Sequence, residues 1–126
     1  MRLLLDTAVF IFAAEAPERF SKRAASFLAN PENTLELSAV SVAEIAIKSS
    51  RGKLAFSHES VRETVGDIQA RLLPFTAAHA SQLFSLPSHH KDPFDRQIIS
   101  QALAEGIAVV TPDESFRLYA GVKVIW

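Results

Sequence analysis

Short apolar segments alternate along this chain with segments that have a helical period, and this alternation constrains the fold more than any other feature. Runs typical of strands occupy residues 2–5, 35–38, 71–75, 108–111 and 122–125. Parallel strands need crossover connections, which are usually helices and are right-handed. The pattern therefore predicts an α/β fold, a three-layer α/β/α sandwich with a central, mostly parallel sheet.

The remaining segments predict helices at about 21–29, 42–50, 59–70, 77–84 and 114–119, with a further helix between Pro93 and Gly106. This last helix has the clearest period, because five apolar side chains share one face: Phe94, Ile98, Ile99, Ala102 and Leu103. Pro74 cannot donate a ladder hydrogen bond, so we expect the strand at 71–75 near an edge of the sheet. A switch in strand order beside the first strand would place Asp6 in a ligand-binding crevice.

The length of 126 residues suffices for one hydrophobic core, so we expect a single domain that spans residues 1–126. Cysteine is absent, which excludes disulfides and thiolate zinc sites and fits a reducing compartment. No apolar run approaches the roughly 20 residues that cross a bilayer, so we expect a cytoplasmic protein without a membrane partner. The net charge of -1 means that a nucleic-acid partner would have to be bound by local basic groups or by a metal ion.

Four acidic residues stand where a predicted strand ends or a predicted helix begins: Asp6, Glu44, Asp95 and Asp113. In an open parallel sheet, ligands collect outside the carboxyl ends of the strands, where residues distant in sequence can meet. Carboxylates at close range raise one another's pKa values, and a bound divalent ion keeps several of them ionised. Oxygen ligands favour Mg²⁺, with Mn²⁺ as a substitute. The acids therefore predict one shared metal site.

Helix capping is the alternative for each acid considered alone. Residues Ser41–Glu44 fit a capping box, and Asp92–Asp95 is typical of a helix start with an aspartate cap, a first-turn proline and a third-position acid. Asp6 and Asp113 also suit caps. Four caps need not converge, whereas these four positions lie where an α/β fold would bring them to one side, so the joint pattern favours a site.

Such a site would activate water and stabilise charge on a phosphoryl group, which makes phosphodiester hydrolysis the natural reaction. Thr111 suits a hydrogen bond to a carboxylate, although threonine at a strand end is more often structural. Arg96 suits either a carboxylate or a phosphate. Three basic residues suit phosphate contact and a helix C-terminus equally: Lys48, Arg51 and Lys53.

Two other segments also have functional and structural interpretations. His89 and His90 are adjacent in a polar loop, where we expect solvated side chains rather than metal ligands. The segment 9–14 is apolar nearly all round, and Phe20 and Phe27 follow it. This aromatic segment predicts a groove for a protein partner, with a fully buried helix pair as the alternative.

Four short motifs occur in one order along the chain: Leu3–Thr7, Ser41–Lys48, His90–Ile99 and Thr111–Phe116. Together with the Val-Ile-Trp tail that ends at Trp126, they resemble the PIN-domain nucleases, particularly the VapC-type toxins of type II toxin-antitoxin pairs. The resemblance spans essentially the whole chain. It implies a PIN-like fold and a Mg²⁺-dependent endoribonuclease that cleaves RNA.

The resemblance also implies roles for particular residues and partners. The catalytic and metal-binding quartet would be the four acids named above. Apart from the resemblance, we expect Thr7, Thr111 and Arg96 to be supporting residues of the same site. A cognate VapB-type antitoxin would block the site, and the chain would form a homodimer. Relatives of this subgroup often carry histidine after the Asp-Thr pair and tryptophan before the glutamate, where this chain has Ala8 and Ala43. A catalytically silent PIN-like interaction module is the competing hypothesis. A phosphoacceptor or nucleotide-binding protein is disfavoured, because no glycine-rich phosphate loop follows the first strand and no second aspartate adjoins Asp6.

Overall fold

Five strands form one parallel sheet in the computed structural model, which describes residues 1–126. The strands are β1 (Arg2–Leu5), β2 (Thr34–Ser38), β3 (Arg71–Leu73), β4 (Ala108–Val110) and β5 (Val124–Ile125), and their order is β3-β2-β1-β4-β5. Every neighbouring pair is parallel. The sheet is therefore entirely parallel, and β3 lies at an edge, as Pro74 predicted.

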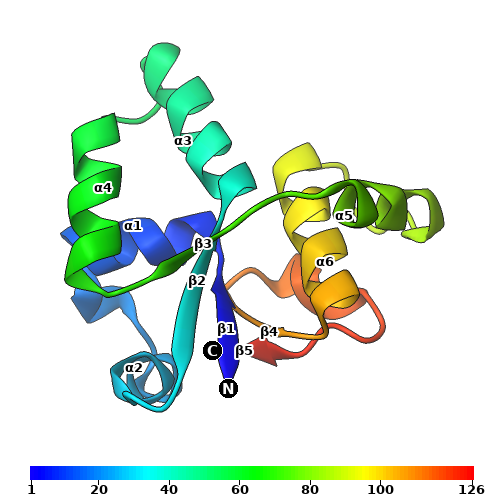
Figure 1. The fold of residues 1–126 in the computed structure, drawn as a ribbon, viewed down its shortest axis with the longest axis horizontal. Coiled ribbons are helices and arrows are strands. Elements are labelled where there is room, and N and C mark those ends of the chain that lie inside the picture. Colours follow the sequence, from blue (N-terminus) through cyan, green and yellow to red (C-terminus); the bar gives the residue numbers. More distant parts are fainter.

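Six α-helices connect and cover the strands: α1 (Thr7–Glu15), α2 (Lys22–Ala29), α3 (Ala39–Ser50), α4 (His58–Asp67), α5 (Ala77–Gln82) and α6 (Pro93–Glu105). Three short 3₁₀ helices complete the chain: η1 (Pro17–Arg19), η2 (Leu83–Ser85) and η3 (Glu114–Leu118). Helices α1, α2 and α4 lie on one side of the sheet, and α5 and α6 lie on the other (Figure 1). The three-layer α/β/α prediction is confirmed, and no helix is both long and apolar enough to cross a membrane.

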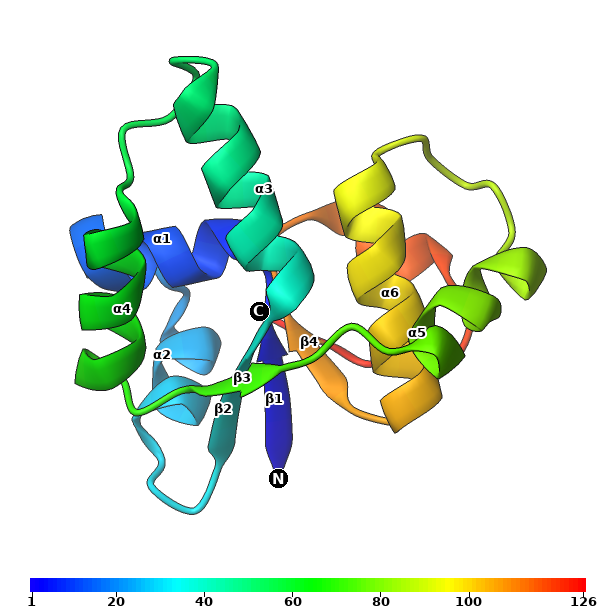
Figure 2. The same cartoon turned by 45° about the horizontal axis from the view of Figure 1, so that its top comes forward.

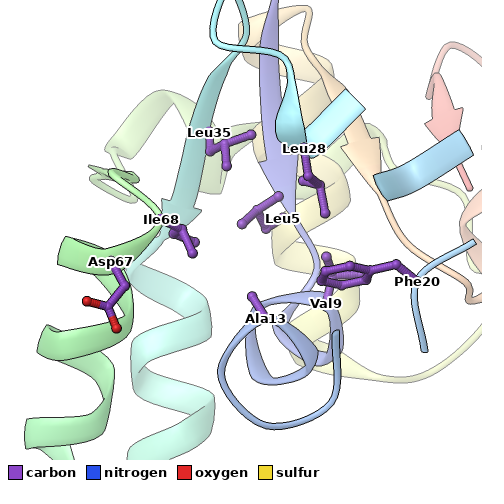
Figure 3. A pocket seen from close by; sticks show the side chains of 8 residues that line it. All are labelled: Leu5, Val9, Ala13, Phe20, Leu28, Leu35, Asp67 and Ile68. Atoms are coloured by element: carbon purple, nitrogen blue, oxygen red, sulfur yellow. The ribbon is translucent and has the colours of Figure 1, made fainter. Parts of the chain in front are cut away.

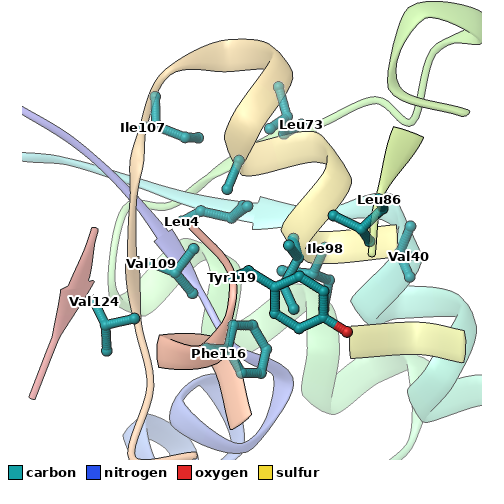
Figure 4. Close-up of a cluster of buried hydrophobic side chains, with 12 residues drawn as sticks. Leu4, Val40, Leu73, Leu86, Ile98, Ile107, Val109, Phe116, Tyr119 and Val124 are labelled. Atoms are coloured by element: carbon teal, nitrogen blue, oxygen red, sulfur yellow. The ribbon is translucent and has the colours of Figure 1, made fainter. Parts of the chain in front are cut away.

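The strand β1 packs into both layers, which explains its uninterrupted apolar sequence. Leu4 belongs to a cluster with Ile98 of α6 on one face of the sheet (Figure 4). Leu3 and Leu5 belong to a second cluster on the other face, together with Val9 of α1. Side chains that alternate between two apolar layers fix the strand in the centre of the sheet, and so fix the position of whatever follows its carboxyl end.

The strand order reverses at β1, because β2 pairs with one side of this strand and β4 pairs with the other. Asp6 follows β1 directly, so it lies at the switch point where parallel sheets bind ligands. Helices α3 and α6 stand on either side of that end of the strand (Figure 2). The predicted crevice position of Asp6 is confirmed.

The start of α3 differs from the sequence prediction. The helix begins at Ala39, and the hydroxyl of Ser38 caps it by accepting a hydrogen bond from the amide of Val40 at 2.9 Å. The predicted start near residue 42, with Ser41 as the cap, is wrong because β2 turns directly into the helix and Ser38 takes the cap position. Consequently Glu44 lies in the second helical turn, where it cannot complete a capping box.

Candidate metal centre

An acidic cleft of about 370 Å³ opens at the carboxyl end of β1. All four predicted acids line it, together with Asp92, and Lys48 and Lys53 supply basic groups at the same cleft. Sequence reasoning treated Asp92 only as a helix cap, although its position three residues before Asp95 is a signal that both belong to one cluster. The fold thus brings five carboxylates from four separate segments to one place.

Asp6 is held by a hydrogen bond across the switch point. Its side chain is only 6% exposed, and its Oδ2 accepts a hydrogen bond from the hydroxyl of Thr111 at 2.7 Å. Burial raises the pKa of Asp6 to about 6, with Glu44 and Asp113 adding to the rise and the Thr111 hydrogen bond opposing it. The carboxylate makes no capping hydrogen bond to α1, so the capping alternative for Asp6 is wrong.

Glu44 has one satisfied oxygen and one orphaned oxygen. The residue is 5% exposed, and its Oε2 pairs with the ammonium of Lys48 one helical turn later. Its Oε1 is buried and has no hydrogen-bond partner in the protein. An unpaired buried carboxylate oxygen costs about 1–3 kcal/mol or more, and a cation ligand would remove that cost. The hydrogen bond to Glu44 in turn raises the pKa of Lys48.

Asp95 lies in the first turn of α6, beside the cap formed by Asp92. Burial raises the pKa of Asp95 to about 8, and the charges of Asp6, Asp92, Asp113 and Glu44 add to the rise. Asp92 caps the helix as predicted, since its Oδ1 accepts hydrogen bonds from the amides of Phe94 and Asp95. Asp95 itself makes no capping contact. Its Oδ2 lies 3.3 Å from Nε2 of His90.

Asp113 is exposed, and it serves as the cap that the structural alternative predicts. Its Oδ1 accepts hydrogen bonds from the amide of Ser115 at 2.9 Å and from the hydroxyl of Ser115 at 2.7 Å. The amide of Asp113 donates to the Thr111 hydroxyl oxygen at 3.0 Å, so Thr111 connects this loop to Asp6. Thr7 also links two segments at the cleft, because its hydroxyl donates to Ser41 of α3 at 2.9 Å.

The acids share a cleft without forming a closed ligand set. No three acidic or histidine side chains lie close enough together to hold a metal ion as they stand. Burial, and to a lesser degree the neighbouring negative charges, raises the pKa values of Asp6 and Asp95, so a cation bound between these side chains would favour their ionised forms. The donor chemistry fits a hard divalent cation such as Mg²⁺ or Mn²⁺, and the orphaned Oε1 of Glu44 is the clearest unused donor. Binding would require the side chains to move toward one another.

Two residues near the acids have contacts that the sequence did not indicate. Arg96 donates to the carbonyls of Pro87 and Leu86 and to the hydroxyl of Tyr119, and it pairs with no carboxylate. His90 is not solvated as expected, because it is 18% exposed and its Nδ1 lies 2.7 Å from the Tyr119 hydroxyl. The place of His90 at the start of the His90–Ile99 motif is the one sequence signal for it, since Tyr119 is far away in sequence.

The two positions that depart from the resemblance lie in different surroundings. Ala8 lines the acidic cleft, so its small side chain leaves room beside Asp6. Ala43 is exposed and does not line the cleft. The departure at residue 8 therefore bears on what the cleft accepts, whereas the departure at residue 43 bears on the outer surface of α3.

Comparison with known protein families finds one family model that matches this chain. The family model described as PIN domain matches residues 3–122, a range that includes every acid of the cleft. The chain belongs to the PIN-domain family. No curated protein sequence matches it. The predicted family is confirmed, and the four short motifs that carried the resemblance fall within the matched range, whereas the Val-Ile-Trp tail lies beyond it.

Solved structures share the fold of this PIN-domain chain at low sequence identity. A chain of VapBC2 from Rickettsia felis, bound to a promoter DNA fragment, has a TM-score of 0.72 and 20% identity, with 98% of this chain and 97% of that chain covered. FitAcB from Neisseria gonorrhoeae has a TM-score of 0.65 and 23% identity, covering 97% and 95%. VapBC-5 from Mycobacterium tuberculosis, described as a toxin-antitoxin system, has a TM-score of 0.60 and 18% identity, covering 98% and 96%. These likenesses establish the fold.

Proposed function

We propose that residues 1–126 form a single PIN domain that acts as a metal-dependent endoribonuclease, the VapC-type toxin of a toxin-antitoxin pair. The observation that carries this proposal is the buried, unpartnered Oε1 of Glu44 in a cleft with four other carboxylates. Membership of the PIN-domain family and the fold of the VapBC complexes support it.

The catalytic and metal-binding residues in this proposal are Asp6, Glu44, Asp95 and Asp113. A bound Mg²⁺ or Mn²⁺ ion would lower the pKa of a water molecule and offset charge on a phosphoryl group. The Thr111 hydroxyl orients Asp6 through its hydrogen bond to Oδ2. Asp95 holds a proton up to about pH 8 in the metal-free protein, so this carboxyl must release its proton before it can serve as an anionic ligand.

RNA would approach the cleft along its basic side. Lys48 and Lys53 line the cleft together with the acids, which provides local positive charge in a chain whose net charge is -1. Phosphate contacts from such side chains position a nucleic acid without reading its sequence. Lys48 is paired with Glu44, so it becomes available to a phosphate when another cation takes over that carboxylate.

The antitoxin would bind over the aromatic segment that follows Asp6. Helix α1 buries Val9 and leaves Phe12 and Ala13 half-buried, so the fully buried alternative does not describe the segment. An apolar cavity of about 320 Å³ lies beneath it, with Val9, Ala13 and Phe20 among its lining side chains (Figure 3). In the proposal, an antitoxin of the VapB type fills this groove and reaches the cleft, in the cytoplasm, on a toxin homodimer.

Cleavage of purified cellular RNA, with and without Mg²⁺, tests the enzymatic proposal. We expect antitoxin-free wild-type protein to cut RNA only with the ion, and Asp6→Asn to lose this activity while it keeps its circular dichroism spectrum. Glu32→Gln is the matched control, because Glu32 is exposed and lies outside the cleft. Absence of both cutting and Mn²⁺ binding in folded wild-type protein would favour the silent interaction module.

The groove proposal has its own test. Hydrogen exchange of the chain with co-purified antitoxin should show protection of residues 9–14 relative to the free chain. Unchanged exchange in this segment would refute the groove and leave the nuclease proposal intact.

A further inference from the structure

A series of hydrogen bonds connects the protein core to Asp95. Nη1 of Arg96 donates to the Tyr119 hydroxyl oxygen at 3.1 Å. That hydroxyl lies 2.7 Å from Nδ1 of His90, and Nε2 of His90 lies 3.3 Å from Oδ2 of Asp95. Neither Tyr119 nor His90 is one of the predicted site residues, and neither lines the cleft.

The Arg96 donor favours one direction for these hydrogen bonds. A guanidinium can only donate, so the Tyr119 oxygen accepts from Arg96 and its own hydrogen is free for Nδ1 of His90. A neutral imidazole that accepts at Nδ1 carries its proton at Nε2. That N–H faces Oδ2 of Asp95, which accepts it when the carboxylate is ionised. In this tautomer of His90, every donor in the series points toward Asp95.

Tyr119 and Arg96, at the core end of this series of hydrogen bonds, are held in place by the surrounding protein. Tyr119 is 2% exposed and its ring packs in the core cluster that contains Phe116 and Ile98, with the hydroxyl directed away from Phe116 (Figure 4). Arg96 is anchored at 2.8 Å and 3.3 Å by the carbonyl oxygens of Pro87 and Leu86. The His90 ring packs edge-on against Tyr119, with centroids 5.5 Å apart. The position of His90 is therefore set by the core and not by solvent.

Asp6, a buried acid of the cleft, has a neutral hydrogen-bonding partner, since the Thr111 hydroxyl orients its carboxylate. Glu44 pairs instead with a cationic group, the Lys48 ammonium, with which a metal ion would compete. Asp95 receives no other side-chain hydrogen bond, so His90 is the group that can fix the rotation of its carboxylate. Ligating carboxylates are themselves hydrogen-bonded in metal sites, and loss of such a partner typically costs about 10- to 100-fold in metal affinity or activity.

We propose that His90 is a positioning residue, which fixes the carboxylate of Asp95 for a divalent cation through the Tyr119 and Arg96 hydrogen bonds, without itself contacting ion or RNA. This inference rests on the proposed function, because it assigns His90 to the same metal site. His90, which we expected to be solvated, thus becomes a hydrogen-bonding partner of a cleft residue.

Mn²⁺ titration followed by electron paramagnetic resonance tests the proposal on the full chain. We expect His90→Ala to weaken Mn²⁺ binding about 10-fold or more, and His90→Gln, which keeps a side-chain N–H, to recover part of the loss. His89→Ala is the matched control: His89 also packs edge-on against Tyr119, at 4.9 Å, but makes no hydrogen bond to Asp95. It should bind Mn²⁺ as wild type does.

Two further measurements separate positioning from folding. Tyr119→Phe retains the buried ring and removes only the hydroxyl, so it should lose Mn²⁺ affinity several-fold with its fold intact. In Mg²⁺-loaded wild-type protein, long-range ¹H–¹⁵N spectra should find His90 protonated at Nε2 and not at Nδ1. The opposite tautomer, or unchanged Mn²⁺ affinity in folded His90→Ala alongside a binding wild type, would overturn this inference alone. Failure of wild type to bind Mn²⁺ would overturn the proposed function and this inference with it.

Discussion

Replacement of Asp95 by asparagine should stabilise the metal-free protein at alkaline pH. The pKa of this carboxyl is about 8 in the folded chain, against an ordinary value of 3.8. Between those pH values the folded state keeps a proton that the unfolded state has lost. Because the folded state binds more protons, the free energy of unfolding falls as pH rises through this window and levels off above it. Asparagine is neutral throughout and escapes that loss.

The size of this stability difference follows from the pKa shift of Asp95, reduced to allow for solvent screening. Each pKa unit corresponds to about 1.4 kcal/mol, so the full shift sets a ceiling of roughly 6 kcal/mol. Asp95 retains access to solvent through the cleft, and screening there reduces the expected gain to about 2–3 kcal/mol. We therefore expect the free energy of unfolding of metal-free Asp95→Asn to exceed that of wild type by about 2–3 kcal/mol at about pH 8.5. At about pH 4 the two free energies should be equal.

Urea unfolding followed by tryptophan fluorescence measures this difference, because Trp126 is the only tryptophan and packs against Phe20 at 6.4 Å between ring centroids. The chelated protein is compared at both pH values, with Glu32→Gln as the exposed control. Saturating Mn²⁺ should reverse the order, since a ligand stabilises only the protein that binds it. Equal or lower stability of metal-free Asp95→Asn at about pH 8.5 would refute the inference that burial and the neighbouring acids raise the pKa of Asp95 in the folded protein.

Three further predictions concern the cleft and its supports. Lys48→Met should strengthen Mn²⁺ binding, measured by calorimetry, roughly 3- to 10-fold, because it removes a competing positive charge. The same variant should weaken RNA binding in a filter-binding assay, and Lys53→Met should weaken RNA binding only. Mn²⁺ affinity should rise from about pH 6 to about pH 8 as Asp6 and Asp95 lose their protons, and a flat calorimetric profile would contradict this. Ser38→Ala should cost about 1 kcal/mol in urea unfolding through loss of the α3 cap, and an unchanged midpoint would argue against that cap.

Periodicity predicted the elements of this fold well because most of them depend on local sequence. The apolar run of β1 and the helix that ends at Gly106 were both found in this way, and Gly106 has the left-handed φ of 66° that favours glycine at a helix end. The start of α3 was missed because Ser38 and Ser41 are both acceptable caps. Only the geometry of β2 decides between them, and that geometry depends on pairing with distant strands.

The acids of the cleft were predictable for a different reason. A parallel sheet places the ends of its strands on one side, so topology alone brings Asp6 toward the other acids. The hydrogen bonds that orient them were not predictable, because Thr111 and Asp6 are joined only when β4 pairs with β1. The expectation for His90 was wrong for the same reason, since its partner Tyr119 directly follows η3 and lies 29 residues away in sequence.

The burial of Asp6 and Glu44 argues against a purely structural role for these acids. Neither carboxylate caps a helix, and one oxygen of Glu44 has no partner at all. A buried polar atom left unpaired costs about 1–3 kcal/mol, a large fraction of the stability of a small domain. If the acids served only to interact with protein, exposed positions would hold them without this cost. This cost favours the proposed cationic ligand for the two carboxylates. If Mn²⁺ binds there, it should raise the free energy of unfolding of the wild-type protein.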